Sequence, residues 1–323
     1  MIMKRFIAKI LVFILIVGVI SVIINFVYMK RDHSDPQNIR KFQNIPSSIM
    51  VCNFGSSHGL YGFNYEDYRD VDCFNFALSS QVLSYDKRVF DEYKDNIANG
   101  AVVFIPVSYF SLYGNPETTD EGFLNKNKRY YQILPSEMIK EYDLKTDIYA
   151  NFPSLSAGVS LIKVLFYGRA DTNEDTWTKV ASDIDVKDDA EKACERHIIS
   201  NKLDENGKRI LNQEEIGALK YLIGACYKNR YTPILVTTPY LSEYTDAIKN
   251  KDPDFLKGFY QQIDEIVEET GVSYYDYGFD DRFTSNYDWF MNSDHLNKEG
   301  ARQFVNILMD EVVHYGTDES LIK

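Results

Sequence analysis

The amino-terminal part of the chain contains an apolar stretch that limits what it can fold into. From Ile10 to Ile24 no side chain is charged or strongly polar, and only Gly18 and Ser21 interrupt the aliphatic residues. Extended to residues 6–29, the stretch reaches the roughly 20 residues that an α-helix needs to cross a bilayer core. Because backbone groups in that environment must hydrogen-bond within their own segment, the stretch predicts a single transmembrane helix.

Basic residues flank this stretch on both sides. Lys4, Arg5 and Lys9 precede it, and Lys30 and Arg31 follow it, so the positive-inside rule gives only a partial orientation. The apolar run is long, and no small-x-small cleavage pattern follows it. We therefore predict an uncleaved, single-pass anchor over residues 1–31, in a cell membrane, with the rest of the chain extracytoplasmic. A long signal peptide is the alternative.

Composition excludes some functions. The chain has 323 residues, of which 45% are hydrophobic and 26% charged, as in an ordinary globular protein. Its net charge is −13 and no large Lys/Arg cluster stands out, so nucleic acid is not an expected partner. The four cysteines have no CxxC spacing, so no zinc site is expected and their disulfide state is not predictable. Neither a metal nor any other cofactor is predicted.

Short apolar strands alternate with helix patterns after a polar linker at 32–46. Strands are predicted at 49–52, 71–78, 101–106, 233–237 and 272–275, and helices at 89–99, 212–229, about 259–271 and about 297–314. Gly100 is predicted to end the first of these helices, and Asn212 and Asn297 to cap the amino ends of two others. The alternation predicts an α/β fold for residues 47–323, a three-layer α/β/α sandwich with a mostly parallel central sheet.

Residues from about 113 to 209 fit this rhythm poorly. They contain aromatic-rich parts and an acidic part, 171–195. We interpret the segment as an insertion over the carboxyl edge of the sheet, where it would form a lid or an acceptor-binding surface. A surface segment with no role in binding is the alternative.

Two polar segments far apart in sequence carry the residue types of a nucleophilic site. Ser57 lies in a glycine-bounded turn, Asn53–Gly59, directly after the first predicted strand. His295 lies in a polar loop just before the last predicted helix. Because an open α/β sheet binds ligands at the carboxyl ends of its strands, the fold can bring this hydroxyl and this imidazole together.

Gly55-Ser56-Ser57 and the loop around His295 resemble the first and last motifs of the SGNH (GDSL-like) hydrolase superfamily, Gly-Asp-Ser and Asp-x-x-His. The resemblance covers most of the chain after the anchor, and it is greatest to membrane-anchored members that act on cell-envelope polymers, such as the teichoic acid D-alanyl transfer protein and exopolysaccharide O-acetyltransferases. It implies a flavodoxin-like sheet, Ser57 as nucleophile and His295 as base. Asn292 stands where the family has Asp, and Asp294 is the nearest carboxylate in sequence, so Asp294 is the candidate third member.

The family's two remaining motifs supply donors to the oxyanion. Ser80 stands where the second motif has glycine, and its backbone N–H is the expected donor. The third motif, Gly-x-Asn-Asp, has no counterpart with asparagine, so Ser108 or Tyr109 would donate instead. Asn292, Ser80 and Ser108 are thus the predicted oxyanion or substrate-binding residues.

The remaining histidines are given lesser roles. His58 follows the nucleophile and is predicted to make local hydrogen bonds or a substrate contact, because the residue after a nucleophile usually faces away from the base. His33 falls in the linker. His197 and His314 are predicted to be surface or helix-packing residues.

The resemblance implies an enzyme, an SGNH-type esterase or O-acyltransferase that moves an acetyl or similar acyl group on a cell-envelope or extracellular polysaccharide. A Ser-His acyl-enzyme mechanism would serve both reactions. The expected partners are the membrane, a glycopolymer or lipid-linked glycan, and a multispan membrane acyltransferase. The alternative is a catalytically silent SGNH-like protein that binds polymer or docks on such an acyltransferase.

Overall fold

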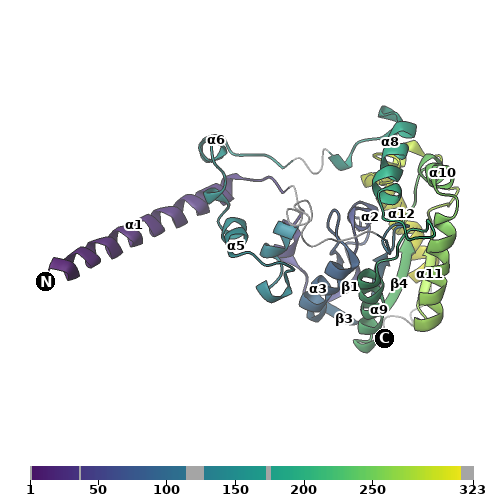
Figure 1. The fold of residues 1–323 in the computed structure, drawn as a ribbon, viewed down its shortest axis with the longest axis horizontal. Coiled ribbons are helices and arrows are strands. Elements are labelled where there is room, and N and C mark those ends of the chain that lie inside the picture. Colours follow the sequence, from purple (N-terminus) through teal and green to yellow (C-terminus); the bar gives the residue numbers. More distant parts are fainter. Residues whose placement is uncertain (1, 36–37, 114–126, 172–175, 314–323) are drawn as a thin grey trace. The chain divides into compact units, whose positions relative to one another are not determined.

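The computed structural model describes residues 2–35, 38–113, 127–171 and 176–313. The chain divides into two compact units. The first, which we call the anchor unit, comprises Met1–Arg40 and Glu117–Asn173, and the second, the sheet unit, comprises Lys41–Pro116 and Glu174–Lys323. Figure 1 colours the elements of both along the sequence.

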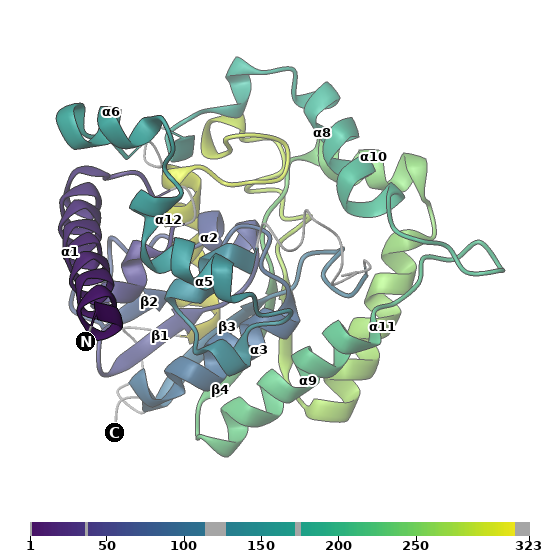
Figure 2. The same ribbon diagram turned by 60° about the vertical axis from the view of Figure 1, so that its left-hand side comes forward.

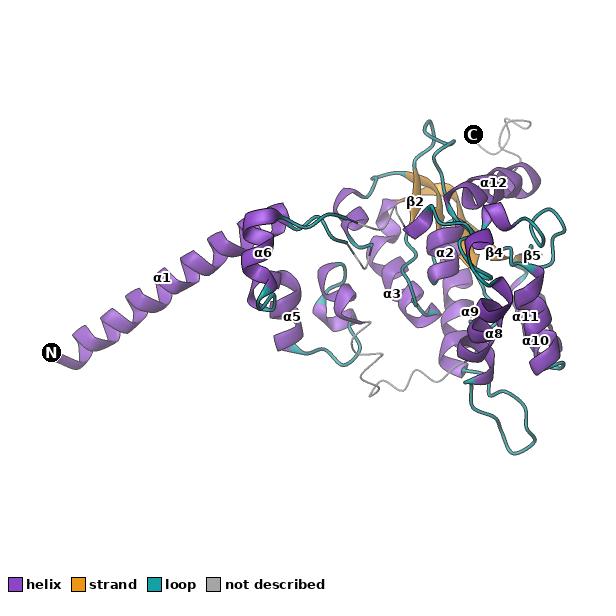
Figure 3. Ribbon diagram, turned by 90° about the horizontal axis from the view of Figure 1, so that it is seen from above, coloured by secondary structure: helices purple, strands orange, loops and turns teal. Residues whose placement is uncertain are grey.

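The sheet unit is built on a five-stranded, entirely parallel sheet in the order β2-β1-β3-β4-β5. Figure 3 colours its strands orange among the helices of the unit. The strands are β1 (Ile49–Asn53), β2 (Cys73–Asn75), β3 (Ile97–Pro106), β4 (Thr232–Thr237) and β5 (Ser273–Asp276). In the register, Val51 pairs with Cys73 on one side and Val102 on the other. This all-parallel sheet flanked by helices confirms the predicted α/β fold class.

Helices flank the sheet, some packed on the strands and others, such as α8 and α10, packed on each other. They are α2 (Ser57–Gly62), α3 (Leu83–Tyr93), α8 (Val186–Cys194), α9 (Gln213–Lys228), α10 (Ser242–Lys251), α11 (Phe255–Thr270) and α12 (Lys298–Leu308). Phe304 and Leu308 of α12 share one buried cluster with Val51, Phe104 and Ile234 of the strands. Helices α3 and α9 pack against each other and lie together beside the strands in Figure 2.

The structure corrects the boundary between the third strand and the helix before it. The helix predicted at 89–99 is α3, which ends at Tyr93, and a 3-10 turn leads directly into β3 at Ile97. Gly100 therefore lies inside β3 and not after a helix, although its φ of +81° is left-handed as predicted for a glycine there. Its N–H donates to the carbonyl of Arg230, at a point where the register between β1 and β3 shifts. Pairing with β1 overrides the local helix pattern, and glycine accommodates the irregularity.

The two predicted amino-terminal caps agree with the structure, whereas the helix predicted at about 259–271 begins four residues earlier, at Phe255. Asn212 accepts hydrogen bonds from the N–H groups of Glu214 and Glu215, and Asn297 accepts one from Gly300. Gly271 follows α11 with a left-handed φ of +71°. The carboxylate of Glu215 also accepts from the N–H and the hydroxyl of Ser84, at 2.9 and 2.8 Å, and so ties α9 to the first turn of α3.

The anchor unit begins with α1 (Ile2–Arg31), which is long and apolar enough to cross a membrane. Within Met3–Arg31, an 18-residue stretch has a mean hydropathy of 3.1, and most of the apolar side chains of the helix are exposed. The unit continues with α5 (Leu144–Asn151), α6 (Ser160–Tyr167) and the 3-10 turns η3 (Lys128–Gln132), η4 (Ser136–Met138) and η5 (Pro153–Leu155).

The last turns of α1 are packed against η5 and α6. Asn25 and Tyr28 are buried, and the amide of Asn25 bonds the carbonyl of Asn151 at 3.3 Å and the N–H of Ser154 at 3.2 Å. Directly after α1, Asp32 forms a parallel bridge with Arg169. The segment predicted as an insertion at 113–209 is thus divided: its described residues 127–171 belong to the same unit as α1, and its described residues 176–209 belong to the sheet unit.

Candidate active site

Ser57 is the first residue of α2, and only Phe54, Gly55 and Ser56 separate it from the end of β1 at Asn53. Gly55 has a left-handed φ of +110°, and a Cβ there would lie 3.2 Å from the ring of Pro106. Its N–H donates to the carboxyl of Asp86 at 2.9 Å. The turn therefore requires glycine at this position, and it delivers Ser57 to the carboxyl end of the sheet.

Two asparagines at the ends of neighbouring strands hold this turn. The side-chain NH2 of Asn53 lies 3.1 Å from both the Gly59 carbonyl and the side-chain oxygen of Asn75. The NH2 group of Asn75 in turn lies 3.1 Å from the carbonyls of Gly59 and Leu60. These amides satisfy carbonyls at the end of the short helix α2 and fix its direction relative to β1 and β2.

The histidine loop is fixed by hydrogen bonds of its own. The side-chain oxygen of Asn292 accepts from the backbone N–H of His295 at 2.8 Å, and Asn297 caps α12 directly after it. As a result, His295 Nε2 lies 2.8 Å from Ser57 Oγ, although the two residues are 238 positions apart in sequence. Both residues are partly exposed. The predicted hydroxyl–imidazole pair is thus brought together at a place that solvent can reach.

Asp294 lies behind this pair. Its Oδ1 is 3.1 Å from His295 Nδ1, and the side-chain oxygen of Asn292 is also 3.1 Å from that nitrogen. Burial alone would raise the pKa of Asp294, but the positive charge that His295 can carry and hydrogen bonds from His295 and His58 hold it well below its usual value. An ionised carboxylate only accepts, so Nδ1 carries a proton and Nε2 is left free to accept from the Ser57 hydroxyl. This is the tautomer that a general base requires.

His58 has a larger role than its sequence position indicated. Its Nε2 lies 3.0 Å from Asp294 Oδ2, and its Nδ1 lies 2.6 Å from the hydroxyl of Ser108. The residue is 2% exposed, and burial lowers its pKa. A neutral ring that donates to Asp294 through Nε2 accepts the Ser108 hydroxyl proton at Nδ1. Ser57, His295, Asp294, His58 and Ser108 therefore form one continuous hydrogen-bonded chain.

The helix geometry explains how adjacent residues reach opposite sides of one carboxylate. Successive side chains on a helix are rotated by about 100°. Ser57 therefore meets His295 while His58 turns into the protein and meets the other oxygen of Asp294. Sequence reasoning predicted that His58 would face away from the base, but it had no way to identify the carboxylate that lies there.

His197 also lies at this site, which corrects its assignment as a surface or helix-packing residue. Its Nδ1 is 3.0 Å from the hydroxyl of Tyr244 and 3.6 Å from Asp294 Oδ2, and its ring stacks on Phe110 with centroids 4.4 Å apart. Burial lowers the pKa of His197 to about 3, so the ring is neutral. His314 lies outside the described residues.

Of the residues predicted to stabilise an oxyanion or bind substrate, only some have the surroundings that this role requires. Ser80 is exposed and has a left-handed φ of +55°, the conformation that glycine adopts most easily, at the position where the resembling family has glycine. The hydroxyl of Ser108 is bonded to His58, and that of Tyr109 lies 3.2 Å from both oxygens of Asp276. Asn292 bonds His295. The structure thus gives these last three side chains other partners.

His58, Asp294 and His295 are also the group, among the described residues, whose possible metal-binding atoms gather within 4.8 Å of one another. Each imidazole faces one oxygen of the carboxylate, and the second nitrogen of each ring meets a hydroxyl. Every one of these polar atoms is satisfied without an ion. The arrangement is therefore suited to moving a proton between Ser57 and His295.

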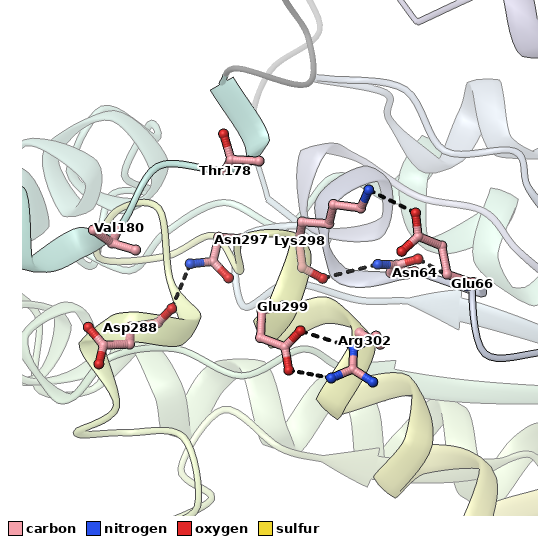
Figure 4. A pocket seen from close by; sticks show the side chains of 9 residues that line it. All are labelled: Asn64, Glu66, Thr178, Val180, Asp288, Asn297, Lys298, Glu299 and Arg302. Atoms are coloured by element: carbon pink, nitrogen blue, oxygen red, sulfur yellow. Dashed lines mark hydrogen bonds and ion pairs between the residues drawn. The ribbon is translucent and has the colours of Figure 1, made fainter.

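A polar pocket near the amino end of α12 does not include this hydrogen-bonded chain (Figure 4). Four of its charged residues form two ion pairs: Lys298 Nζ lies 2.8 Å from Glu66, and Arg302 bonds Glu299 at 2.6 Å. The Asn297 side chain donates to the Asp288 carbonyl at 2.7 Å. We interpret these contacts as support for the loop that carries His295.

One aromatic ring, that of Tyr61, contacts the His295 imidazole, and a second, that of Trp177, contacts Tyr61. The Tyr61 ring lies edge-on to the imidazole, with centroids 5.8 Å apart, and the Trp177 ring is 6.4 Å from Tyr61. Trp177 is partly buried, and its indole N–H has no hydrogen-bond partner among the described residues. Apolar ring faces beside a hydroxyl–imidazole pair can support either an acyl chain or a sugar ring.

No protein-family model matches this chain, and no curated protein matches it either. The chemistry of the site therefore has to be inferred from its own residues.

Proposed function

We propose that this protein is a membrane-anchored serine acyl-ester hydrolase or acyltransferase of the SGNH type. The observation that carries the proposal is the 2.8 Å contact between Ser57 Oγ and His295 Nε2, with buried Asp294 on the other nitrogen of the ring. A nucleophile, a base within hydrogen-bond reach and a carboxylate that orients the base are the parts that acyl transfer through a serine requires.

In the proposed reaction, Ser57 Oγ attacks an ester carbonyl while His295 Nε2 accepts the hydroxyl proton. The ester C–O bond then breaks, and His295 returns that proton to the leaving alcohol, which leaves an acyl group on Ser57. Water, or a hydroxyl of an acceptor, next gives its proton to His295 and attacks the acyl carbonyl. The bond between Ser57 Oγ and the acyl carbon then breaks, which releases the acid or the new ester, and His295 returns the proton to Ser57 Oγ. The backbone N–H of Ser80 is the proposed donor to the oxyanion. Hydrolysis and transfer differ only in the acceptor.

The proposal places α1 in a membrane as a permanent anchor. Asn25 and Tyr28 are buried against residues of the anchor unit, and Arg31 donates to the carbonyl of Phe166 at 2.9 Å. Removal of a signal peptide would expose those partners, which favours retention of the helix. An enzyme held on the outer side of a membrane favours a lipid-linked or envelope-attached glycopolymer as substrate, with an acetyl or similar group as the acyl unit. Tyr61 and Trp177 are the proposed contacts for its sugar rings.

The test uses the full chain in detergent micelles. Wild type is expected to hydrolyse 4-nitrophenyl acetate and to be labelled at Ser57 by a fluorophosphonate. Ser57→Ala is expected to lose both the hydrolysis and the labelling. Ser56→Ala is the matched control, because this neighbouring hydroxyl makes no capping hydrogen bond to α2. Activity of Ser57→Ala equal to that of wild type would show that the nucleophile is wrong.

Two further experiments distinguish the proposed serine chemistry from a metal-dependent reaction and from polymer binding without catalysis. Loss of activity on chelation, restored by a divalent metal, would favour the three-residue group as a metal site. A wild-type chain that is inert to both reagents but binds envelope polymer would support the catalytically silent alternative.

A further inference from the structure

The helix α6 of the anchor unit exposes large apolar side chains. Ile162 and Phe166 are 66% and 72% exposed, while Val159, just before the helix, and Tyr167, its last residue, are 97% and 86% exposed. Val159, Ile162 and Phe166 are spaced three and four residues apart, so they lie along one face of the helix. Val164 is buried, and α6 packs against α1.

The contact with α1 fixes the level of α6 along the proposed span. Asn25, the first buried residue of that contact region, precedes Arg31 by six positions, which is about 9 Å of helix. A bilayer is about 30 Å thick in its core and about 40–45 Å with its headgroups, which leaves roughly 5–8 Å for each interface. The part of α1 that η5 and α6 cover therefore corresponds to one interfacial layer and the adjoining edge of the apolar core.

The positions of basic residues are consistent with α6 lying at the depth of a membrane interface. Lys30 and Arg31 close α1, Lys163 is exposed on α6, and Arg169 follows it. Arg169 pairs with Asp32 at 3.4 Å. Long basic side chains next to exposed aliphatic and aromatic residues are the composition of a helix that lies in the plane of a membrane interface.

We propose that α6, together with Val159, lies in the interface of the same bilayer that α1 crosses. Its exposed face continues the lipid-facing surface of α1, so that Ile162 and Phe166 contact the acyl chains near the headgroups and Lys163 reaches the phosphates. The occupant of this surface is therefore lipid. This inference rests on the membrane-anchor part of the proposed function and is independent of the chemistry at Ser57.

The test measures the depth of an introduced tryptophan in the full chain. Phe166→Trp, Val17→Trp in the middle of α1, and Tyr227→Trp on α9 are each reconstituted in phosphatidylcholine–phosphatidylglycerol vesicles. The lipids carry bromine, a quencher, either near the headgroup end or near the middle of the acyl chains. Emission in excess of wild type reports the new residue, because the native tryptophans, Trp177 and Trp289, are present in every variant.

The added emission of Phe166→Trp should be blue-shifted and should be lost mainly with the shallow quencher. The added emission of Val17→Trp should be lost mainly with the deep quencher. Tyr227→Trp, which replaces a 45% exposed aromatic residue of the sheet unit, should respond to neither.

Two outcomes would overturn the inference, and they are distinguishable. If Phe166→Trp is unquenched while Val17→Trp is quenched, the interfacial position of α6 is refuted, and a water-exposed or protein-covered surface replaces it. If Val17→Trp is unquenched as well, the membrane anchor of the proposed function is itself refuted.

Discussion

Replacement of Asp294 by asparagine distinguishes a charged from a merely polar partner for His295. The change keeps the size of the side chain and removes its charge. In wild type, one nitrogen of His58 and one of His295 face the Asp294 carboxylate. The substitution replaces one carboxylate oxygen by an NH2 group, which faces one of these nitrogens. If that group donates to His295 Nδ1, the ring proton moves to Nε2, where it faces Ser57 and prevents the ring from acting as a base.

The expected loss follows from the distance. His295 Nδ1 and Asp294 Oδ1 are 3.1 Å apart, which puts the centres of the two charges about 4 Å apart, and at an effective dielectric constant of about 20 their attraction is about 4 kcal/mol. A barrier raised by that amount slows a reaction about a thousandfold. Asn292→Ala removes only neutral hydrogen bonds to the same loop, for which about 1 kcal/mol, or less than a tenfold loss, is expected.

The assay is the rate at which a fluorophosphonate labels Ser57, followed by mass spectrometry of the intact chain. It needs no knowledge of the natural substrate. Circular dichroism of each variant checks that it is folded. Labelling of Asp294→Asn at the wild-type rate, together with slow labelling of Asn292→Ala, would refute the electrostatic reasoning and make Asn292 the orienting residue.

Three further predictions concern the folded scaffold. Burial raises the pKa of Asp86 to about 7, so the folded state keeps a proton that the unfolded chain loses near pH 4, and the free energy of unfolding falls as pH rises between these values. Asp86→Asn should reduce this pH dependence in urea unfolding measured at pH 5 and pH 8. An unchanged pH dependence would contradict the assignment. Gly59→Ala places a Cβ 2.3 Å from the Phe54 carbonyl and should lower the free energy of unfolding by about 1–3 kcal/mol and slow Ser57 labelling, whereas wild-type values for both would show that the turn can adjust. Asn212→Ala should cost about 1 kcal/mol in the same unfolding assay without slowing Ser57 labelling, and slower labelling would mean that the α9 cap affects the site.

The parts of the fold that follow a period were predictable from the sequence. Alternating strands and helices identified the α/β class, and helix-end residues such as Asn212, Gly271 and Asn297 have the predicted conformations. The pairing of Ser57 with His295 followed from topology, because parallel strands bring their carboxyl ends to one edge. Gly100 was misplaced because strand pairing with β1 is a long-range interaction that a local pattern does not contain.

The inner part of the site could not be predicted for a similar reason. His58 and Asp294 are 236 positions apart, and nothing near either residue identifies the other. His197 comes from a π-helical turn between α8 and the next loop, where no periodic pattern marks a buried face. A histidine directly after a candidate nucleophile is a usable signal only if a buried carboxylate can be located independently.

The amide of Asn25 has one more consequence. It is a polar group at the end of the long apolar stretch of α1, and its partners are backbone atoms of residues 151 and 154. The helix is consequently a structural member of a folded unit and not an interchangeable tether. If α1 is the anchor proposed above, a chimera that carries an unrelated membrane span in its place would deprive residues 144–169 of the surface on which they assemble, even where that span inserts.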